Sequence, residues 1–327
     1  MARTVLVTGA GGFIGSHLVD ALLERGDTVR AMVRYSSTGS WGWLERYARD
    51  TPAGLEILAT DIRDPFSVSG AVRGCSLVFH LASLIAIPYS YHAPASYVDT
   101  NVTGTLNVLQ ACREHGTERM VHTSTSEVYG TAQYVPIDER HPLVGQSPYS
   151  ATKIAADKLV ESFHLSFGLP LVTLRPFNTF GPRQSARAVI PTVITQALAG
   201  SEVIRLGAVR PVRDMNFVTD TVSSFLAAAS CDACVGQTLN SGRGEGISIG
   251  DLAREILDLC GSHAEIATDE RRLRPERSEV LDLVCDSSRL RETTGWRPAH
   301  TLREGLEKTI AWFRDNREGY KEALYNV

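Results

Sequence analysis

The stretch Thr4-Val-Leu-Val-Thr-Gly-Ala-Gly-Gly-Phe-Ile-Gly15 joins a β-branched run directly to a segment with helical periodicity. Its glycines at 9, 12 and 15 have the spacing GxxGxxG. A strand that turns sharply into a helix needs glycine at the turn, where a pyrophosphate and the helix approach the backbone. The pyrophosphate would lie at the helix N-terminus, where free N–H groups and the helix dipole favour an anion. The pattern therefore predicts a dinucleotide site formed by Gly9, Gly12, Phe13, Ile14 and Gly15, the alternative being a purely structural turn.

Short β-branched runs alternate with helical stretches through the rest of the first half. Strands are expected at 4–8, 28–33, 55–59, 77–81, 119–123 and 171–175, and helices at 12–25, 65–73, 101–115 and 149–167. This alternation predicts βαβ units and a parallel sheet that is covered on both faces. Because crossovers are right-handed, we expect an α/β, doubly wound Rossmann sheet that binds ligands outside the carboxyl ends of its strands.

The alternation loosens after residue 175, where proline and glycine become frequent. Helices are expected at 190–199, 249–259 and 302–313, with a short strand at 203–206. We therefore predict a dinucleotide-binding domain over 1–175 and a smaller mixed domain over 176–327 that binds the substrate. Since no linker separates the halves, a return to the first domain is expected near 212–245.

Composition narrows the classes of function. The 327 residues carry a net charge of −4, with 43% hydrophobic and 21% charged residues, which excludes a disordered chain. Without a cationic surplus, binding to nucleic acid or to an anionic membrane is disfavoured. The longest apolar run, near 77–87, is too short to span a membrane, and no export signal is evident. Six scattered cysteines, with only Cys231 and Cys234 in CxxC spacing, predict no metal site and a reducing cytoplasm.

The end of the second expected strand bears on the choice of cofactor. An acidic residue there binds the ribose hydroxyls of NAD, whereas an arginine accommodates the 2′-phosphate of NADP. This chain has Val33-Arg34-Tyr35-Ser-Ser37 and no acid. Arg34 therefore favours NADP over NAD, unless it stacks on adenine or is merely solvated. Asp61, after the third strand, is placed to accept a hydrogen bond from the adenine amino group or to be a solvated loop residue.

A candidate acid/base pair opens the helix at 149–167. Ser147 is a suitable N-cap and Pro148 a suitable first helical residue. Tyr149 and Lys153 are four residues apart and share one helix face. A nearby ammonium favours the phenolate, so the pKa of Tyr149 is expected below its ordinary value of about 10. Such a tyrosine can move a proton on a sugar hydroxyl as hydride leaves the same carbon.

Polar side chains follow the fifth expected strand, at the edge of the sheet where ligands bind. Thr125 could hydrogen-bond the hydroxyl that Tyr149 deprotonates, Ser126 could contact a leaving group, and Glu127 could remove an acidic carbon proton. The alternative is that these residues only cap the strand end.

Together these motifs resemble an extended short-chain dehydrogenase/reductase of the nucleotide-sugar epimerase/dehydratase group. The resemblance covers essentially the whole chain, and it also rests on residues 79–82, Asn101 with Gly104-Thr105, residues 124–130 and residues 175–182. Within the group, residues 182–191 and 274–280 are similar to the 4,6-dehydratases of legionaminic acid pathways.

The resemblance implies roles for individual residues. Thr125, Tyr149 and Lys153 match the family's triad, and Glu127 matches its general base. The implied cofactor contacts also include Ile62, Leu81 and Ala82, and the implied substrate contacts are Ser83, Thr125, Asn178, Arg187, Arg213 and Arg274. Arg213 and Arg274 would hold the nucleotide diphosphate, which suits guanidinium geometry, unless they form surface ion pairs.

One position departs from many of the resembling dehydratases, which carry Thr-Asp-Glu where this chain has Thr-Ser126-Glu. The motif therefore does not separate dehydration from decarboxylation. The expected reaction is 4,6-dehydration of UDP-N-acetylglucosamine or a GDP analogue, with a tightly bound, recycled NADP or NAD. The alternatives are a 4-epimerase, a UDP-glucuronate decarboxylase and, in another class, a non-catalytic NAD(P)-binding regulator.

The helices expected at 101–115 and 149–167 carry apolar residues on more than one face, namely Val102, Leu106, Leu109, Ile154, Leu159 and Phe163. A helix that is apolar on two faces is buried on two faces. Resembling enzymes commonly pair these helices across a two-fold axis, so a homodimer is expected. The alternative is that the C-terminal half of the same chain covers the second face.

Overall fold

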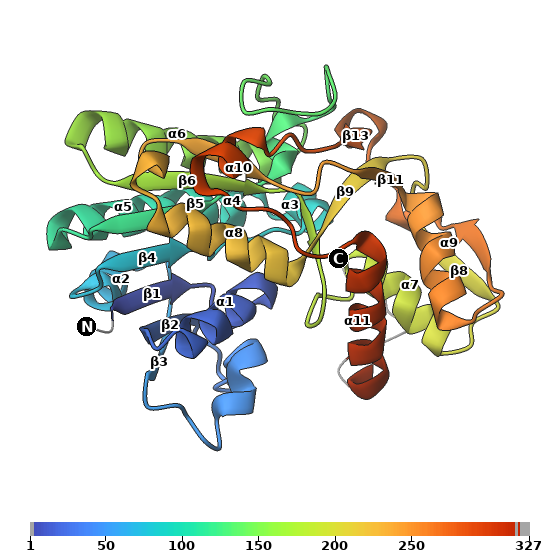
Figure 1. The fold of residues 1–327 in the computed structure, drawn as a ribbon, viewed down its shortest axis with the longest axis horizontal. Coiled ribbons are helices and arrows are strands. Elements are labelled where there is room, and N and C mark those ends of the chain that lie inside the picture. The colour runs from blue at the N-terminus through green and yellow to red at the C-terminus, as the bar shows by residue number, and fades with distance from the viewer. Residues whose placement is uncertain (1–2, 318–319, 321–327) are drawn as a thin grey trace.

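A computed structural model describes residues 3–317 and residue 320. Its main feature is a seven-stranded parallel sheet with the order β10-β6-β5-β4-β1-β2-β3, whose labelled strands lie one below another at the left of Figure 1. The strands are β1 (Thr4–Thr8), β2 (Thr28–Arg34), β3 (Leu55–Thr60), β4 (Leu77–His80), β5 (Arg119–Thr123), β6 (Leu171–Pro176) and β10 (Thr238–Ser241). The expected doubly wound α/β sheet is confirmed.

Helices cover both faces of this sheet and create two separate cores. On one face α1 (Phe13–Glu24) packs beside α8 (Val218–Ser230) over residues such as Val5 and Val7. On the other face lie α2 (Pro65–Val72), α5 (Gly104–His115) and α6 (Pro148–Phe167), over residues such as Leu6 and Val78. Alternate residues of β1 thus point into different cores, as the pleat of a strand requires.

The small sheets and the helices α7 (Val189–Leu198), α9 (Ile249–Cys260) and α11 (Leu302–Asp315) lie beyond the carboxyl ends of the strands, at the right of Figure 1. β9 (Val212–Phe217) pairs with β7 (Asn178–Phe180), β11 (Gly246–Ser248) and β13 (Asp282–Leu283), and β8 (Val203–Leu206) pairs with β12 (Glu265–Thr268). A third core joins α7, α9 and α11. The short helices are α3 (Ile87–His92), α4 (Pro94–Tyr97) and α10 (Ser288–Thr294).

The chain crosses between the two groups of elements more than once. Within the expected return segment, β9 belongs to the small sheet, whereas α8 and β10 join the large one. These three elements had no specific sequence-based prediction. The final residues of the expected 176–327 domain, 318–319 and 321–327, lie outside the described residues, as do residues 1–2 of the expected 1–175 domain.

Two local features complete the comparison with the sequence. The segment expected to start a helix at residue 101 begins earlier, as a π-helical turn over Val98–Thr103 that leads into α5. Cys231 caps the C-terminal end of α8 and donates to the Thr293 carbonyl.

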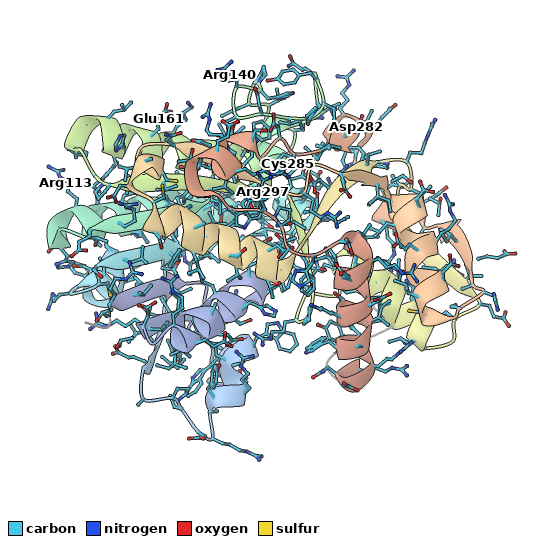
Figure 2. The ribbon with its side chains drawn as sticks, viewed as in Figure 1. Arg113, Arg140, Glu161, Asp282, Cys285 and Arg297 are labelled. Atoms are coloured by element: carbon cyan, nitrogen blue, oxygen red, sulfur yellow. The ribbon has the colours of Figure 1, made fainter. Side chains whose placement is uncertain are left out.

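Figure 2 shows Cys285 among the central elements and Arg113 and Arg140 at the periphery. No helix within the described residues is long and apolar enough to cross a membrane.

Candidate active site

The glycine loop brings the ends of β1 and β4 together. Gly9 has φ +70°, and a Cβ built there would lie 2.8 Å from the backbone nitrogen of Ala82. The Thr8 hydroxyl accepts hydrogen bonds from the backbone nitrogens of Leu81 and Ala82, at 3.1 and 3.0 Å. His80 extends this contact, with its Nδ1 2.9 Å from the Thr8 hydroxyl and its Nε2 3.0 Å from that of Thr105. Two of the motifs that carried the resemblance thus meet at the glycine loop.

A cavity of about 430 Å³ opens beside this loop. It is within the size range of small-molecule and cofactor sites. Its lining includes six residues singled out from the sequence, namely Gly9, Arg34, Asp61, Ile62, Ala82 and Ser83. Ser83, expected to contact the substrate, therefore lines this cavity. The close-packed glycine turn, the N-terminus of α1 and the cavity together fit a dinucleotide.

The polar rim of the cavity contains one residue that the sequence analysis missed. The guanidinium of Arg63 donates to the Asp61 carboxylate through Nη2 and Nε, at 2.6 and 3.0 Å. These hydrogen bonds lower the pKa of Asp61, so its carboxylate is charged and already engaged. Arg34 is exposed at the same cavity. The turn Asp61-Ile-Arg63 is the sequence signal that could have placed a second arginine there.

Tyr149 and Lys153 are placed by a well-defined helix start. Ser147 and Ser150 form a capping box at α6, with Pro148 in the first turn. Both functional side chains are buried, and Nζ of Lys153 donates to the Thr123 carbonyl at 2.7 Å. Burial lowers the pKa of Lys153 to about 8, although the charge of Asp157 partly opposes this.

The expectation of a depressed pKa for Tyr149 is wrong for this structure. Burial raises the pKa of the phenol, and a hydrogen bond with the Thr125 hydroxyl offsets this only in part. Lys153 is not among the groups that shift the pKa of Tyr149, and its ammonium group donates to the Thr123 carbonyl. An additional positive charge or a hydrogen-bonded hydroxyl of a ligand would be needed to favour the phenolate.

The polar residues after β5 form a short 3₁₀ turn, Ser126–Tyr129. Thr125 caps this turn by accepting a hydrogen bond from the backbone nitrogen of Glu127 at 3.2 Å, while it also meets Tyr149. Thr125 therefore both caps the 3₁₀ turn and contacts the phenol of Tyr149. Ser126 is buried, and Oε2 of Glu127 lies 3.9 Å from Nη1 of Arg274.

A buried polar network that the sequence analysis missed supports this turn. The Oδ2 atom of Asp157 accepts hydrogen bonds from Ser124 at 2.8 Å and from Nε and Nη2 of Arg175 at 3.1 and 2.9 Å. Nε2 of His122 lies 3.3 Å from the other carboxylate oxygen. Asp157 follows Lys153 by one helical turn, a spacing that could have signalled a buried partner. The network joins β5, β6 and α6 next to Thr125 and Lys153.

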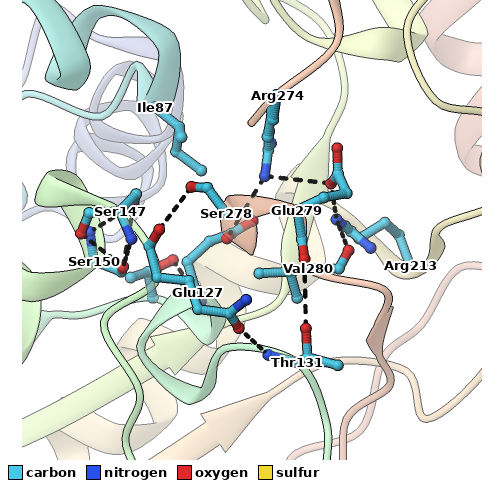
Figure 3. A network of polar contacts seen from close by, with 12 residues as sticks. Ile87, Glu127, Thr131, Ser147, Ser150, Arg213, Arg274, Ser278, Glu279 and Val280 are labelled. Atoms are coloured by element: carbon cyan, nitrogen blue, oxygen red, sulfur yellow. Dashed lines mark hydrogen bonds and ion pairs between the residues drawn. The ribbon is translucent and has the colours of Figure 1, made fainter. Parts of the chain in front are cut away.

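The residues expected to contact the substrate differ in their surroundings (Figure 3). Arg213 is buried and donates to the backbone carbonyls of residues 212, 280 and 281, at 2.8–3.0 Å. Arg274 is partly exposed and approaches Glu127 and Glu279. Oδ1 of Asn178 is buried without a hydrogen-bond partner in the described part of the chain, as expected of a ligand contact. Arg187 is exposed and donates to Ser185.

The family model for GDP-mannose 4,6 dehydratase matches residues 6–309. The chain belongs to this family. Its fold and glycine loop are those of the extended short-chain dehydrogenase/reductase type, as the sequence predicted.

Members of this family that resemble the chain differ in their reactions. A dTDP-glucose 4,6-dehydratase of Streptomyces antibioticus is 31% identical over 96% of this chain and 93% of its own length. A UDP-glucose 4-epimerase of Mycolicibacterium smegmatis is 33% identical over 95% and 98%. The structure of the dTDP-glucose 4,6-dehydratase DesIV of Streptomyces venezuelae with NAD bound has a TM-score of 0.88 and 28% identity, covering 98% of this chain and 99% of that one. Relatives also include a UDP-N-acetyl-alpha-D-glucosaminuronate decarboxylase of Bacillus cytotoxicus.

Proposed function

We propose that the protein is a nucleotide-sugar 4,6-dehydratase that forms a 4-keto-6-deoxy sugar nucleotide. The observation that favours this reaction over 4-epimerisation is Glu127, a second acid/base group that directly follows Thr125 and Ser126. The choice of dehydration over decarboxylation rests on the similarity of residues 182–191 and 274–280 to legionaminic-pathway dehydratases. Oxidation at C4 requires one proton-transfer group, which Tyr149 supplies. Removal of a carbon-bound proton requires another, and a carboxylate is suited to that task once a neighbouring ketone has made the proton acidic.

Each residue of the proposed active site has its own role in this reaction. Tyr149 takes the proton of the C4 hydroxyl, and Thr125 holds that hydroxyl beside the phenol. Lys153, while charged, stabilises the phenolate that must form in a buried site. Glu127 then removes the C5 proton, and Ser126 contacts the hydroxyl that leaves from C6. A bound nicotinamide dinucleotide would accept the hydride from C4 and return it at C6.

We further propose that this dinucleotide is NADP, tightly held and recycled. The glycine turn at Gly9, Gly12 and Gly15, with Phe13 and Ile14 at the start of α1, would hold its pyrophosphate, and Leu81 and Ala82 would contact it from β4. Arg34 and Arg63 at the rim of the cavity support a 2′-phosphate, because guanidinium groups bind phosphate well. NAD is the alternative, in which case Arg34 would contact only the adenosine.

For the substrate we propose UDP-N-acetylglucosamine or a GDP analogue. The similarity of residues 182–191 and 274–280 to legionaminic-pathway dehydratases supports this sugar class. Arg274, with its unfilled guanidinium donor, supports a diphosphate group. The free thiols of all six cysteines support a cytoplasmic location, where thiols stay reduced.

A homodimer built on α5 and α6 completes the proposal. Val102, Leu106, Ile154, Leu159 and Phe163 are half-buried within one chain and would be covered by the equivalent helices of a second copy. Leu109 is fully buried in the core of its own chain and therefore does not contribute to that face. Light scattering tests the dimer, and a mass near 35.6 kDa that persists at high micromolar protein would contradict it.

Product analysis tests the proposed reaction. The purified protein is incubated with UDP-, GDP- and dTDP-linked hexoses and N-acetylhexosamines and with UDP-glucuronate, and products are identified by NMR and mass spectrometry. We expect a 4-keto-6-deoxy product, lighter than its substrate by one water. A 4-epimer without mass change, or a pentose with release of carbon dioxide, would support a related reaction of the same family instead. Failure on every sugar would favour a non-catalytic regulator.

A further inference from the structure

Two arginines and two glutamates meet where the segment after η5 (Glu270–Arg272) crosses the candidate active site (Figure 3). Oε1 of Glu279 lies 3.6 Å from Nη2 of Arg213 and 3.7 Å from Nη1 of Arg274. The same Nη1 lies 3.9 Å from Oε2 of Glu127. The formal charges of these four groups cancel, so the cluster has no net positive charge to offer an incoming anion.

The contacts in this cluster are too long for hydrogen bonds between nitrogen and oxygen, which fall at 2.7–3.2 Å. Arg213 is satisfied by backbone carbonyls instead. Nη1 of Arg274, in contrast, is buried and has no hydrogen-bond partner among the described residues. Glu279 therefore neutralises Arg274 without filling its hydrogen-bond donors. A group with closer oxygen atoms would fill them.

The segment that carries Glu279 is held by hydrogen bonds at residues 277, 278 and 279. The hydroxyl of Ser278 donates to the Gln146 carbonyl at 2.6 Å, and Nε2 of Gln146 donates to the Arg277 carbonyl at 3.1 Å. The Thr131 hydroxyl donates to the carbonyl of Glu279 itself at 3.4 Å. These bonds fix the backbone from which the Glu279 carboxylate reaches the two arginines.

We propose that Glu279 is an internal anion that competes with the diphosphate of the nucleotide sugar for Arg274, weakens the binding of the nucleotide and speeds its release. The proposal rests on the proposed function, which supplies the diphosphate. A carboxylate within 4 Å of the guanidinium groups repels the phosphate oxygens that approach the same donors. Since related ligands differ in affinity mainly through their dissociation rates, the effect is expected in the release of nucleotide. Glu279 thus acts on the binding and release of the nucleotide rather than on the chemical step.

Binding of UDP, GDP and dTDP to the purified holoenzyme tests this role by titration calorimetry and stopped-flow dissociation. Glu279→Gln keeps the size of the side chain and removes its charge. We expect it to bind its nucleotide about tenfold more tightly and to release it about tenfold more slowly, as suits one charge removed from a partly screened site. Glu279→Asp, which keeps the charge, should remain within about threefold of wild type. Glu276→Gln, an exposed charge in the same segment, should remain within about twofold.

Unchanged or weaker binding by Glu279→Gln would overturn the inference while leaving the proposed function intact, since the wild-type protein would still bind the nucleotide. The same holds if Glu279→Asp behaves like Glu279→Gln, because the charge would then not be responsible. If neither the wild-type protein nor Glu279→Gln binds any of the three nucleoside diphosphates, both the inference and the proposed substrate class are contradicted.

Discussion

Lys153 and Asp157 lie one turn apart on α6, and both side chains are buried. The carboxylate of Asp157 accepts hydrogen bonds from Ser124 and Arg175, and its charge opposes the loss of the Lys153 proton. Asp157 therefore connects the proposed proton-transfer residues to the framework of the sheet. This arrangement links stability to the pH dependence of activity.

Asp157→Asn should destabilise the fold. Removing one partner of a buried ion pair leaves the charge of Arg175 uncompensated, which typically costs about 3–5 kcal/mol. We expect the free energy of unfolding, measured by urea denaturation at pH 7, to fall by about that amount. Asp258→Asn, at an exposed site on α9, is the matched control and should change it by about 0.5 kcal/mol or less. Equal effects of the two variants would show that the network is not important for stability.

In the wild-type protein, acid should remove the stabilisation that the Asp157 carboxylate provides. Burial opposes ionisation of Asp157, but His122, Arg175 and Lys153 lower its pKa to about 2, below the ordinary value of 3.8. A depressed pKa stabilises the folded state above the unfolded-state value, and this stabilisation is lost as the pH falls from about 4 through about 2. The stability difference between the wild type and Asp157→Asn should therefore narrow over this interval. A constant difference would contradict the assigned pKa.

The pH profile of kcat/KM should show an alkaline limb that reports Lys153. Burial lowers the pKa of this lysine to about 8, so the charged form needed beside Tyr149 is lost above that pH. Activity should therefore decline above about pH 8. Because Asp157 raises the pKa of Lys153, Asp157→Asn should move the limb to lower pH. A limb that stays in place in this variant would show that another group controls it.

Glu127→Gln should separate oxidation from elimination. The amide cannot accept the C5 proton, so solvent deuterium should no longer enter at C5, while oxidation at C4 remains measurable as transient nicotinamide absorbance. The expected loss of overall turnover is about 10²–10⁴-fold. Ser126→Ala should reduce turnover less, because a water can replace the serine hydroxyl. Normal deuterium uptake at C5 in Glu127→Gln would remove Glu127 from the role of base.

The identity of the bound dinucleotide tests whether Arg34 binds the 2′-phosphate of NADP. Protein purified and then denatured should release NADP, and Arg34→Ser should release less NADP relative to NAD, because one phosphate contact is lost. Exposed Arg140→Ser serves as the control and should not alter this ratio. Recovery of NAD alone from the wild-type protein would contradict the NADP assignment.

The sequence predicted the parts of the fold that local pattern controls. Apolar runs such as 119–123 and the glycine turn at Gly9 mark their elements directly. β10 escaped prediction because its four residues, Thr-Leu-Asn-Ser, include buried polar side chains, and Asn240 and Ser241 are satisfied only by partners distant in the chain. The pKa of Tyr149 was predicted with the wrong direction because burial, which no local motif reveals, raises it, and the charges of Glu127 and Asp157 act in the same direction. The contacts of Arg213 and Glu279 likewise depend on segments that only the tertiary fold brings together.

Hydrogen tracing in a single incubation tests the central claim most directly. A nucleotide sugar carrying deuterium at C4 and C5 is converted in ordinary water, and the product is examined by NMR. If Tyr149 and Glu127 act in succession as a dehydratase, the C4 deuterium should appear in the C6 methyl group of a 4-keto product, and the C5 deuterium should be replaced by a solvent proton. Deuterium that remains at C4 of a hexose with its C6 hydroxyl intact would show that elimination does not occur, and would contradict the account.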